Sequence, residues 1–184
     1  MMLSDGSITS NNSINLGLKD KEHIIKFQKA IGAINNKIIE IKDNRYEHLC
    51  INYRLSIRDG QMAKDLAKYG CLPNKSYSNF SFPNIPKQFL YDFIRGYFDG
   101  DGSIYYTNNK YVISFVGNKD FLEELKKILG KPLLSLCQNK ISKITYDLKI
   151  SGQKDVKRIL NLLYENSTKE TRLDRKYEIV QKIL

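Results

Sequence analysis

Two aspartates, Asp5 and Asp101, lie in nearly the same short sequence, because each is followed by Gly-Ser-Ile. Asp101 ends the run FIRGYFDGD, and its apolar residues belong to a helix that we predict over residues 88–99. An Asp-Gly pair after such a helix would place a carboxylate just past it, at the start of a strand. Carboxylate oxygens are ligands that Mg²⁺ prefers, and bound Mg²⁺ can activate a water and stabilise a leaving oxygen.

The two aspartates stand at the head of two copies of an internal repeat. Each copy continues with an asparagine pair, Asn11-Asn12 or Asn108-Asn109, then a Lys-Asp pair, then an apolar stretch that ends at Gly32 or Gly130. These landmarks recur in the same order, about a hundred residues apart. A solenoid needs at least three short repeats, so two long copies indicate a pseudo-twofold protein.

The same elements are predicted in both copies. Asparagine tolerates the positive φ of a tight turn, so each asparagine pair predicts a hairpin, and apolar spacing predicts the helices. The expected segments are two hairpins (7–18 and 103–116), two helices (20–31 and 121–129), two alternating strands (49–57 and 144–151) and closing helices (59–69, 153–164 and 173–184). The predicted fold class is α+β, with two pseudo-twofold-related αββαββα halves and antiparallel sheets.

The boundary between the halves is expected in a stretch rich in Ser, Asn and Pro. Residues 76–87 form this predicted linker, between an N-terminal half (1–75) and a C-terminal half (88–184).

The charge of the chain favours a polyanionic partner. Thirty Lys and Arg against twenty Asp and Glu give a formal net charge of +10, which would attract nucleic acid through steering and counterion release. A generally lysine-rich proteome would explain the same charge. Cys50, Cys71 and Cys137 are scattered and odd in number, which argues against a disulfide framework or a zinc site. With no secretion signal and no apolar stretch long enough for a membrane, we expect an intracellular protein without a membrane partner.

Other catalytic arrangements find no support in the sequence. His23 and His48 are the two histidines, and both are expected to be structural or surface residues. No Ser–His or Cys–His pairing is evident, and no phosphate-binding GxxxxGK loop occurs.

The segment IRGYFDGDG, residues 94–102, resembles the nine-residue LAGLIDADG motif of homing endonucleases at its small, apolar and acidic positions. Asp101 matches the metal-binding aspartate of the motif and Asp99 its earlier, structural acid, whereas Arg95 stands where a small residue is usual. The segment MMLSDG, residues 1–6, resembles only the tail of a first motif, with Leu3 where an acid is often seen. The chain is thus similar to single-chain, two-motif members with the first motif truncated at its N-terminus.

The resemblance implies a site-specific endonuclease of double-stranded DNA that works as a monomer, its two sheets forming a DNA-binding saddle. In the family two motif helices pack along the pseudo-twofold axis, and a glycine lets helix backbones approach closely. Gly96, Phe93 and Tyr97 are the expected interface residues. The implied metal ligands are Asp5 and Asp101, with Ser4 and Gly100 beside them, and Mg²⁺ or Mn²⁺ is the expected cofactor.

The family also places a lysine near each active site. The segments that resemble this feature give Lys75 and Lys176 as expected catalytic residues, which would stabilise phosphate charge or order water. A solvated surface charge is an equally good explanation for either lysine.

The polar faces of the predicted strands are the expected DNA-binding surface, since two-stranded ribbons fit the major groove and Arg and Asn read base edges. For any single residue, the solvent side of an amphipathic strand is the simpler explanation. The residues concerned are Thr9, Asn15, Asn52 and Arg54 from the first half, and Tyr105, Thr107, Thr145 and Lys149 from the second.

Two further functions of the same fold stay open from the sequence. One is an inactive DNA-binding regulator, and the other is a maturase that binds intron RNA. Regulators of this type can lose the acids, whereas this chain has both Asp5 and Asp101. A nuclease of this family would be encoded by a mobile intron, an intein-like element or a freestanding gene, and a truncated first motif also allows an inactive relic.

Overall fold

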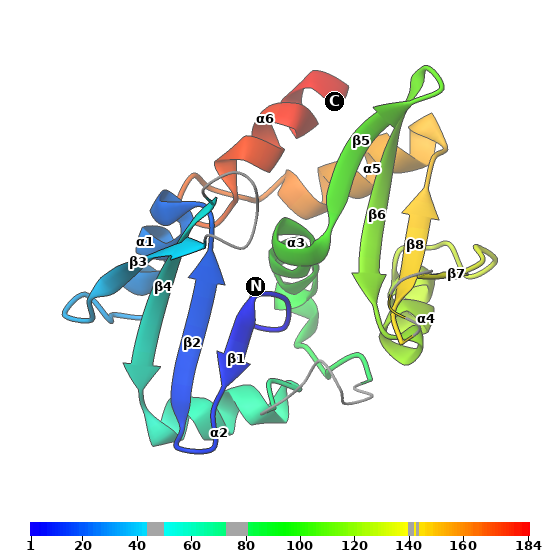
Figure 1. Ribbon diagram of the computed structural model, residues 1–184. Helices are drawn as coiled ribbons and strands as arrows, with labels where there is room; N and C mark the ends of the chain where they lie inside the picture. Colours follow the sequence, from blue (N-terminus) through cyan, green and yellow to red (C-terminus); the bar gives the residue numbers. More distant parts are fainter. Residues whose placement is uncertain (44–49, 73–80, 140–141, 143) are drawn as a thin grey trace. The chain divides into compact units, whose positions relative to one another are not determined.

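The computed structural model describes residues 1–43, 50–72, 81–139, 142 and 144–184, and Figure 1 shows the course of the chain. The chain divides into two compact units, Met2–Tyr77 and Ser78–Leu184, and Met1 groups with the second. None of the described helices has both the length and the apolar character that crossing a membrane requires.

The N-terminal unit contains a four-stranded antiparallel sheet with the strand order β1-β2-β4-β3. Its turn between β1 and β2 has Asn12 at φ 60°, and Gly32 at φ 71° follows the first helix. Both are left-handed conformations, which asparagine and glycine adopt most readily. The predicted hairpin and glycine stop are confirmed here. The elements are β1 (Gly6–Ile8), β2 (Ser13–Leu18), α1 (Lys21–Ala30), β3 (Ile38–Asp43), β4 (Cys50–Arg58) and α2 (Gly60–Lys68).

The C-terminal unit repeats this plan, and its sheet has the equivalent order β5-β6-β8-β7. Asn109 at φ 58° lies in its hairpin turn and Gly130 at φ 70° follows α4. Two antiparallel four-stranded sheets, each with its helices, confirm the predicted α+β fold of two similar halves (Figure 1). The elements are a 3₁₀ turn η2 (Lys87–Phe89), α3 (Leu90–Asp101), β5 (Ser103–Thr107), β6 (Lys110–Gly117), α4 (Lys119–Ile128), β7 (Cys137–Gln138), β8 (Tyr146–Ile150), α5 (Gln153–Tyr164) and α6 (Asp174–Ile183).

One face of each sheet packs against helices of its own unit. In the N-terminal unit, Leu16 and Leu55 are paired in register and buried, and α1 and α2 contact the strands that carry such residues. In the C-terminal unit, Phe115 and Leu148 are the equivalent buried pair, beneath α3, α4 and α5. Because side chains alternate along a strand, the other face of each sheet points away from these helices.

The structure differs from the sequence predictions at several boundaries. The helix α3 runs to Asp101, two residues beyond its predicted end, and Ile144 precedes β8 with 59% of its surface exposed instead of beginning the strand. The edge strands β3 and β7 were not located from the sequence, since one is irregular in pattern and the other has two residues. Residues 2–5 form turns. Leu49 and residues 76–80 of the predicted linker lie outside the described residues.

Candidate active site

Asp101 is the last residue of α3, and its side chain is exposed. This position corrects the expectation that its carboxylate projects just past the helix, since the helical turn includes Asp101 itself. The strand β5 begins two residues later, at Ser103. Between them a Cβ atom on Gly102 would lie 2.5 Å from the carbonyl oxygen of Phe98, so only glycine fits at this turn from helix to strand.

Asp5 has a matching local setting in the N-terminal unit. A Cβ atom on Gly6 would lie 2.7 Å from the carbonyl oxygen of Met2, four residues earlier, which is the relation that Gly102 has to Phe98. The Asp5 carboxylate accepts a hydrogen bond from the Ser4 hydroxyl at 3.1 Å. The glycine that follows each aspartate therefore has a physical cause, because the chain folds back too tightly there for any larger residue.

Lys176 lies in α6, with its ammonium group buried at the C-terminal end of α3. Its Nζ donates to the carbonyl oxygens of Phe98, of Asp99 at 2.9 Å and of Gly102 at 2.5 Å. These three bonds engage all three ammonium hydrogens, and a positive charge is favourable at this end of a helix. Lys176 therefore holds the helix end that carries Asp101. Its expected contact with phosphate stays a prediction, which would require the ammonium group to leave these carbonyls.

Asp99 is buried beneath the same helix end and joins α3 to two other helices. Its carboxylate accepts the hydroxyl of Tyr164, the last residue of α5, at 2.5 Å, and the backbone N–H of Leu173, just before α6, at 3.1 Å. Burial raises the pKa of Asp99 above its ordinary value, against the opposing effect of these bonds and of the charges on Lys176 and Arg95. Burial also raises the pKa of Tyr164, so its hydroxyl remains a donor.

Arg95, which replaces the usual small residue of the motif, serves the contact between α3 and α5. Its buried guanidinium donates from Nη1 to the carbonyl oxygen of Leu163 at 3.2 Å and pairs with Asp92 at 2.8 Å. Within the described part of the chain, no acceptor faces its Nε. This side chain extends toward α5, so it does not occupy the end of the helix where Asp101 lies.

Tyr97 packs inside the C-terminal unit. Its hydroxyl donates to the carbonyl oxygen of Val116 at 2.7 Å, and its ring centroid lies 4.4 Å from that of Phe121. Burial raises the pKa of Tyr97, and the negative charge of Asp101 adds to this effect.

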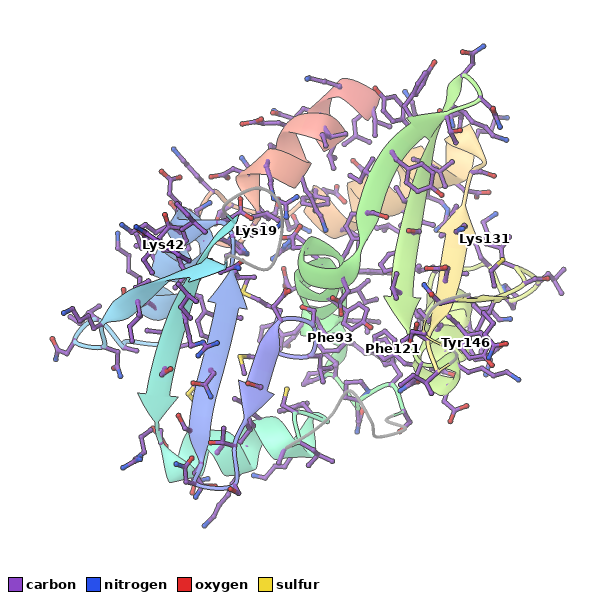
Figure 2. All side chains as sticks on the ribbon, viewed as in Figure 1. Lys19, Lys42, Phe93, Phe121, Lys131 and Tyr146 are labelled. Atoms are coloured by element: carbon purple, nitrogen blue, oxygen red, sulfur yellow. The ribbon has the colours of Figure 1, made fainter. Side chains whose placement is uncertain are left out.

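Phe93 contacts Phe82 edge-on, with ring centroids 5.4 Å apart, and Phe82 in turn stacks on Phe121; Figure 2 labels Phe93 and Phe121. Gly96 is half-buried in the middle of α3. The expected role of Phe93, Gly96 and Tyr97 at a contact between two motif helices stays a prediction.

The face of the N-terminal sheet that points away from α1 and α2 carries most of the expected DNA-binding residues of that half. Asn15, Asn52 and Arg54 share this face because their strands pair in register. We call it the N-terminal open face; the described residues that define it are Ser7, Asn15, Ile39, Ile41, Asn52, Arg54 and Ser56. Asn15 accepts a hydrogen bond from the Ser56 hydroxyl at 2.6 Å. Thr9 follows β1 in the hairpin turn, where its hydroxyl donates to the carbonyl oxygen of Ser13 at 3.2 Å.

The C-terminal sheet brings Tyr105, Thr107 and Lys149 to its own open face, together with Ser103 at the start of β5. Tyr105, Thr107 and Lys149 are exposed. Thr145 lies just before β8, where its hydroxyl donates to the carbonyl oxygen of Ser142 at 3.3 Å. Ser103 follows Asp101 by two residues, so the carboxylate lies next to the beginning of this face.

The ligands expected at the two aspartates, Asp5 with Ser4 and Asp101 with the Gly100 carbonyl, would bind through oxygen atoms. Among the described residues no group of three or more His, Cys, Asp or Glu could hold a metal ion by itself. Mg²⁺, however, is commonly bound through one or two carboxylates together with waters and substrate phosphates. The oxygens of Asp101 and of the Gly100 carbonyl, and those of Asp5 and Ser4, are donors of the type that Mg²⁺ prefers.

Two features of the site were not found from the sequence, and one expected residue is not described. Tyr164 and the Leu173 N–H, which bind Asp99, could not be identified from the sequence. An apolar helical pattern that ends in Tyr is typical of a core helix and does not indicate a partner for a buried acid. Lys75 lies outside the described residues.

Comparison with known proteins relates part of this chain to a known domain family. The sequence profile of the LAGLIDADG-like domain matches residues 88–164. No curated protein sequence matches the chain. Among solved structures, the chain is similar to full-length DUF199/WhiA from Thermatoga maritima, with 13% identity and a TM-score of 0.59 over 99% of this chain. It spans 56% of that protein.

Two nuclease structures are similar over more of their own length. The meganuclease I-SmaMI, bound to uncleavable DNA, shares 11% identity with a TM-score of 0.63, over 99% of this chain and 86% of that one. The I-LtrWI LAGLIDADG homing endonuclease, bound to its target DNA, shares 11% identity with a TM-score of 0.59 over the same fractions. At such identities the similarity shows the fold. Residues 88–164 are therefore a LAGLIDADG-like domain, in a chain that has the two-half fold of the LAGLIDADG homing endonucleases.

Proposed function

We propose that this chain is a site-specific endonuclease of double-stranded DNA that requires Mg²⁺ or Mn²⁺. The observation that carries the proposal is the setting of Asp101. Its exposed carboxylate lies on the last turn of a helix whose end is held by buried Lys176 and Asp99. This carboxylate lies next to the beginning of a sheet face with exposed polar side chains. A duplex bound on that face would therefore lie close to a firmly held carboxylate that can take part in its cleavage.

The chain supplies both binding and metal ligands for this reaction. The two open faces would bind the duplex, and the net charge of +10 would attract it. Asp101 with Gly100, and Asp5 with Ser4, would each hold one divalent ion. When bound, this ion supplies an activated water and stabilises the leaving oxygen. One aspartate in each half gives one carboxylate for each DNA strand. The names of the I-SmaMI and I-LtrWI structures, both bound to DNA, support DNA as the partner.

Cleavage-site selection tests the proposal. Purified protein is incubated with a randomised duplex library in Mg²⁺, with Ca²⁺ as the control ion. We expect recovery of one long sequence cut on both strands in Mg²⁺ only. Absence of specific cutting and of specific binding would refute both the nuclease and the DNA partner.

The active-site assignment is tested by Asp101→Asn. This substitution keeps the shape of the side chain but removes the charge that holds the metal, so double-strand cleavage should be lost while DNA affinity stays within about threefold. Asp120→Asn, which changes an exposed aspartate of α4, is the matched control and should cleave like the wild type. Cleavage of both strands at the wild-type rate by Asp101→Asn would show that the assignment is wrong.

A second function, binding without cleavage, is favoured by one observation. The Lys176 ammonium group is bonded to three backbone carbonyls, whereas a nuclease lysine would face phosphate. A DNA-binding regulator or an intron RNA maturase would keep the fold and the open faces in this state. Tight, specific binding of duplex DNA or of structured RNA without cleavage in Mg²⁺ or Mn²⁺ would favour this alternative.

A further inference from the structure

The N-terminal open face contains two apolar side chains among its polar ones. Ile39 and Ile41 lie on β3, and Ile39 has 52% of its surface exposed while Ile41 is half-buried. Their register puts them beside the expected base-reading residues, with Ile39 opposite Arg54 and Ile41 opposite Asn52. The next residues along the same strand, Glu40 and Lys42, pair with Tyr53 and Ile51 on the other face.

This arrangement reverses the usual pattern of an amphipathic edge strand. A solvent-facing edge strand commonly carries polar or charged side chains, which discourage pairing with other chains. Here Ile39 and Ile41 occupy the face that points away from α1 and α2. Ile38 and the charged residues Glu40 and Lys42 occupy the side of the helices. The two isoleucines therefore contribute apolar surface where the rest of the face offers hydrogen-bond donors.

We infer that Ile39 and Ile41 determine specificity by contacting the 5-methyl groups of thymines in the major groove. This inference rests on the proposed binding of duplex DNA. Arg is suited to guanine and Asn to adenine, whereas an apolar side chain recognises the thymine methyl. Ile39 lies directly across from Arg54, and Ile41 lies directly across from Asn52. Each cross-strand pair therefore combines an apolar contact with a polar one.

The spacing of the two contacts follows from strand geometry. Residues two apart on a strand are separated by roughly 6.7 Å, and base pairs rise by about 3.4 Å each. Ile39 and Ile41 should thus address positions that are about two base pairs apart. The expected signature is a pair of thymines at that separation in the half of the target bound by the N-terminal unit.

Replacement of thymine by uracil tests the inference, because it removes the methyl group and leaves base pairing intact. The preferred duplex is first selected in Ca²⁺, and each thymine of the target is then replaced singly. For the wild type, we expect loss of affinity of about fourfold at each of two thymines, which is the value for one buried methyl group. Ile39→Ala should be insensitive to uracil at one of these positions, and Ile41→Ala at the other.

The matched control is Ile34→Ala, which removes an isoleucine that is 69% exposed and lies outside the sheet. It should keep the uracil sensitivity of the wild type, and all variants should melt near the wild-type temperature. Specific binding that ignores uracil, or sensitivity that persists in both Ile39→Ala and Ile41→Ala, would overturn the inference and leave the proposed function intact. Failure of the wild type to bind any duplex would overturn both. Uracil sensitivity without cleavage would support the inference and count against the nuclease.

Discussion

Replacement of Lys176 by methionine should destabilise the protein, because the ammonium group supports the end of α3. Lys176 is 5% exposed, and its ammonium group donates to the carbonyl oxygens of Phe98, Asp99 and Gly102. Methionine has a similar volume and no hydrogen to donate, so these buried carbonyls would lose their partner. The effect should also reach Asp101, since the last turn of its helix would no longer be held.

The magnitude follows from two opposing effects. Hydrogen bonds to a charged group contribute about 1.5–3 kcal/mol each, and three are lost. Against this, methionine avoids the cost of burying an ammonium group, which is several kcal/mol. We expect a net decrease of about 3 kcal/mol in the free energy of unfolding. In urea this corresponds to a midpoint lower by roughly 1–2 M.

Equilibrium unfolding in urea, followed by circular dichroism, measures this change. Lys182→Met is the matched control, because Lys182 is exposed on the same helix and its loss should cost less than about 0.5 kcal/mol. A second measurement addresses the role in DNA binding. If Lys176 holds the helix end, the dependence of DNA affinity on salt should be the same in the wild type and the variant, since no phosphate contact is lost.

The refuting result is equally specific. A Lys176→Met variant that unfolds at the wild-type urea midpoint would show that the three carbonyl bonds do not stabilise the fold. If in addition its salt dependence fell by about 0.9 in log–log slope, the ammonium would be neutralising one phosphate instead.

Two further predictions concern the same helix end. Burial raises the pKa of Asp99 above 3.8, so the folded state binds this proton more readily than the unfolded state. We therefore compare the free energy of unfolding of the wild type with that of Asp99→Asn. The wild-type value minus the variant value should fall as the pH rises from below 3.8 through the higher pKa of Asp99 in the folded state. Urea titrations across this pH range measure the difference, and a difference that rises with pH would contradict the reasoning. Gly102→Ala should lower the free energy of unfolding by about 1–3 kcal/mol and reduce cleavage, because its Cβ would overlap Phe98. Gly17→Ala is its control, since a Cβ there would meet no atom closer than 4.0 Å, and equal stability of the two variants would refute the steric argument.

The fold was largely predictable because its landmarks are local. The asparagine turns and the glycines after α1 and α4 are set by backbone conformations that few residues adopt, so they are visible in the sequence of each copy. The strand β3 escaped prediction for a physical reason. Its isoleucines at positions 38, 39 and 41 fall on both faces of the sheet, so the alternation that identifies a half-buried strand is absent.

The candidate site was predictable at Asp5 and Asp101 and not in the groups that support Asp101. Each aspartate is followed by a glycine at which a Cβ atom would clash with the carbonyl oxygen of the residue four positions earlier. This constraint involves only a few neighbouring residues of the chain. The bonds of Asp99, by contrast, reach Tyr164 and the Leu173 N–H, which are 65 and 74 residues away. Sequence spacing carries no information about contacts at that range.

The same distinction explains which motif positions repeat between the halves and which do not. The glycine occurs in both, because a Cβ atom at this turn would clash wherever the chain passes from this segment into a strand. The acid two residues before the second aspartate does not recur: the counterpart of Asp99 in the first half is the buried residue Leu3. A buried carboxylate is tolerable only where hydrogen bonds satisfy it, and the C-terminal unit provides them from α5 and from the residue before α6. An apolar side chain needs no such partners, so leucine can fill the equivalent buried position in the other half. The buried groups that support Asp101 among the described residues, Asp99 and Lys176 with their partners, all lie in the C-terminal unit, so their removal should lower the stability of that unit.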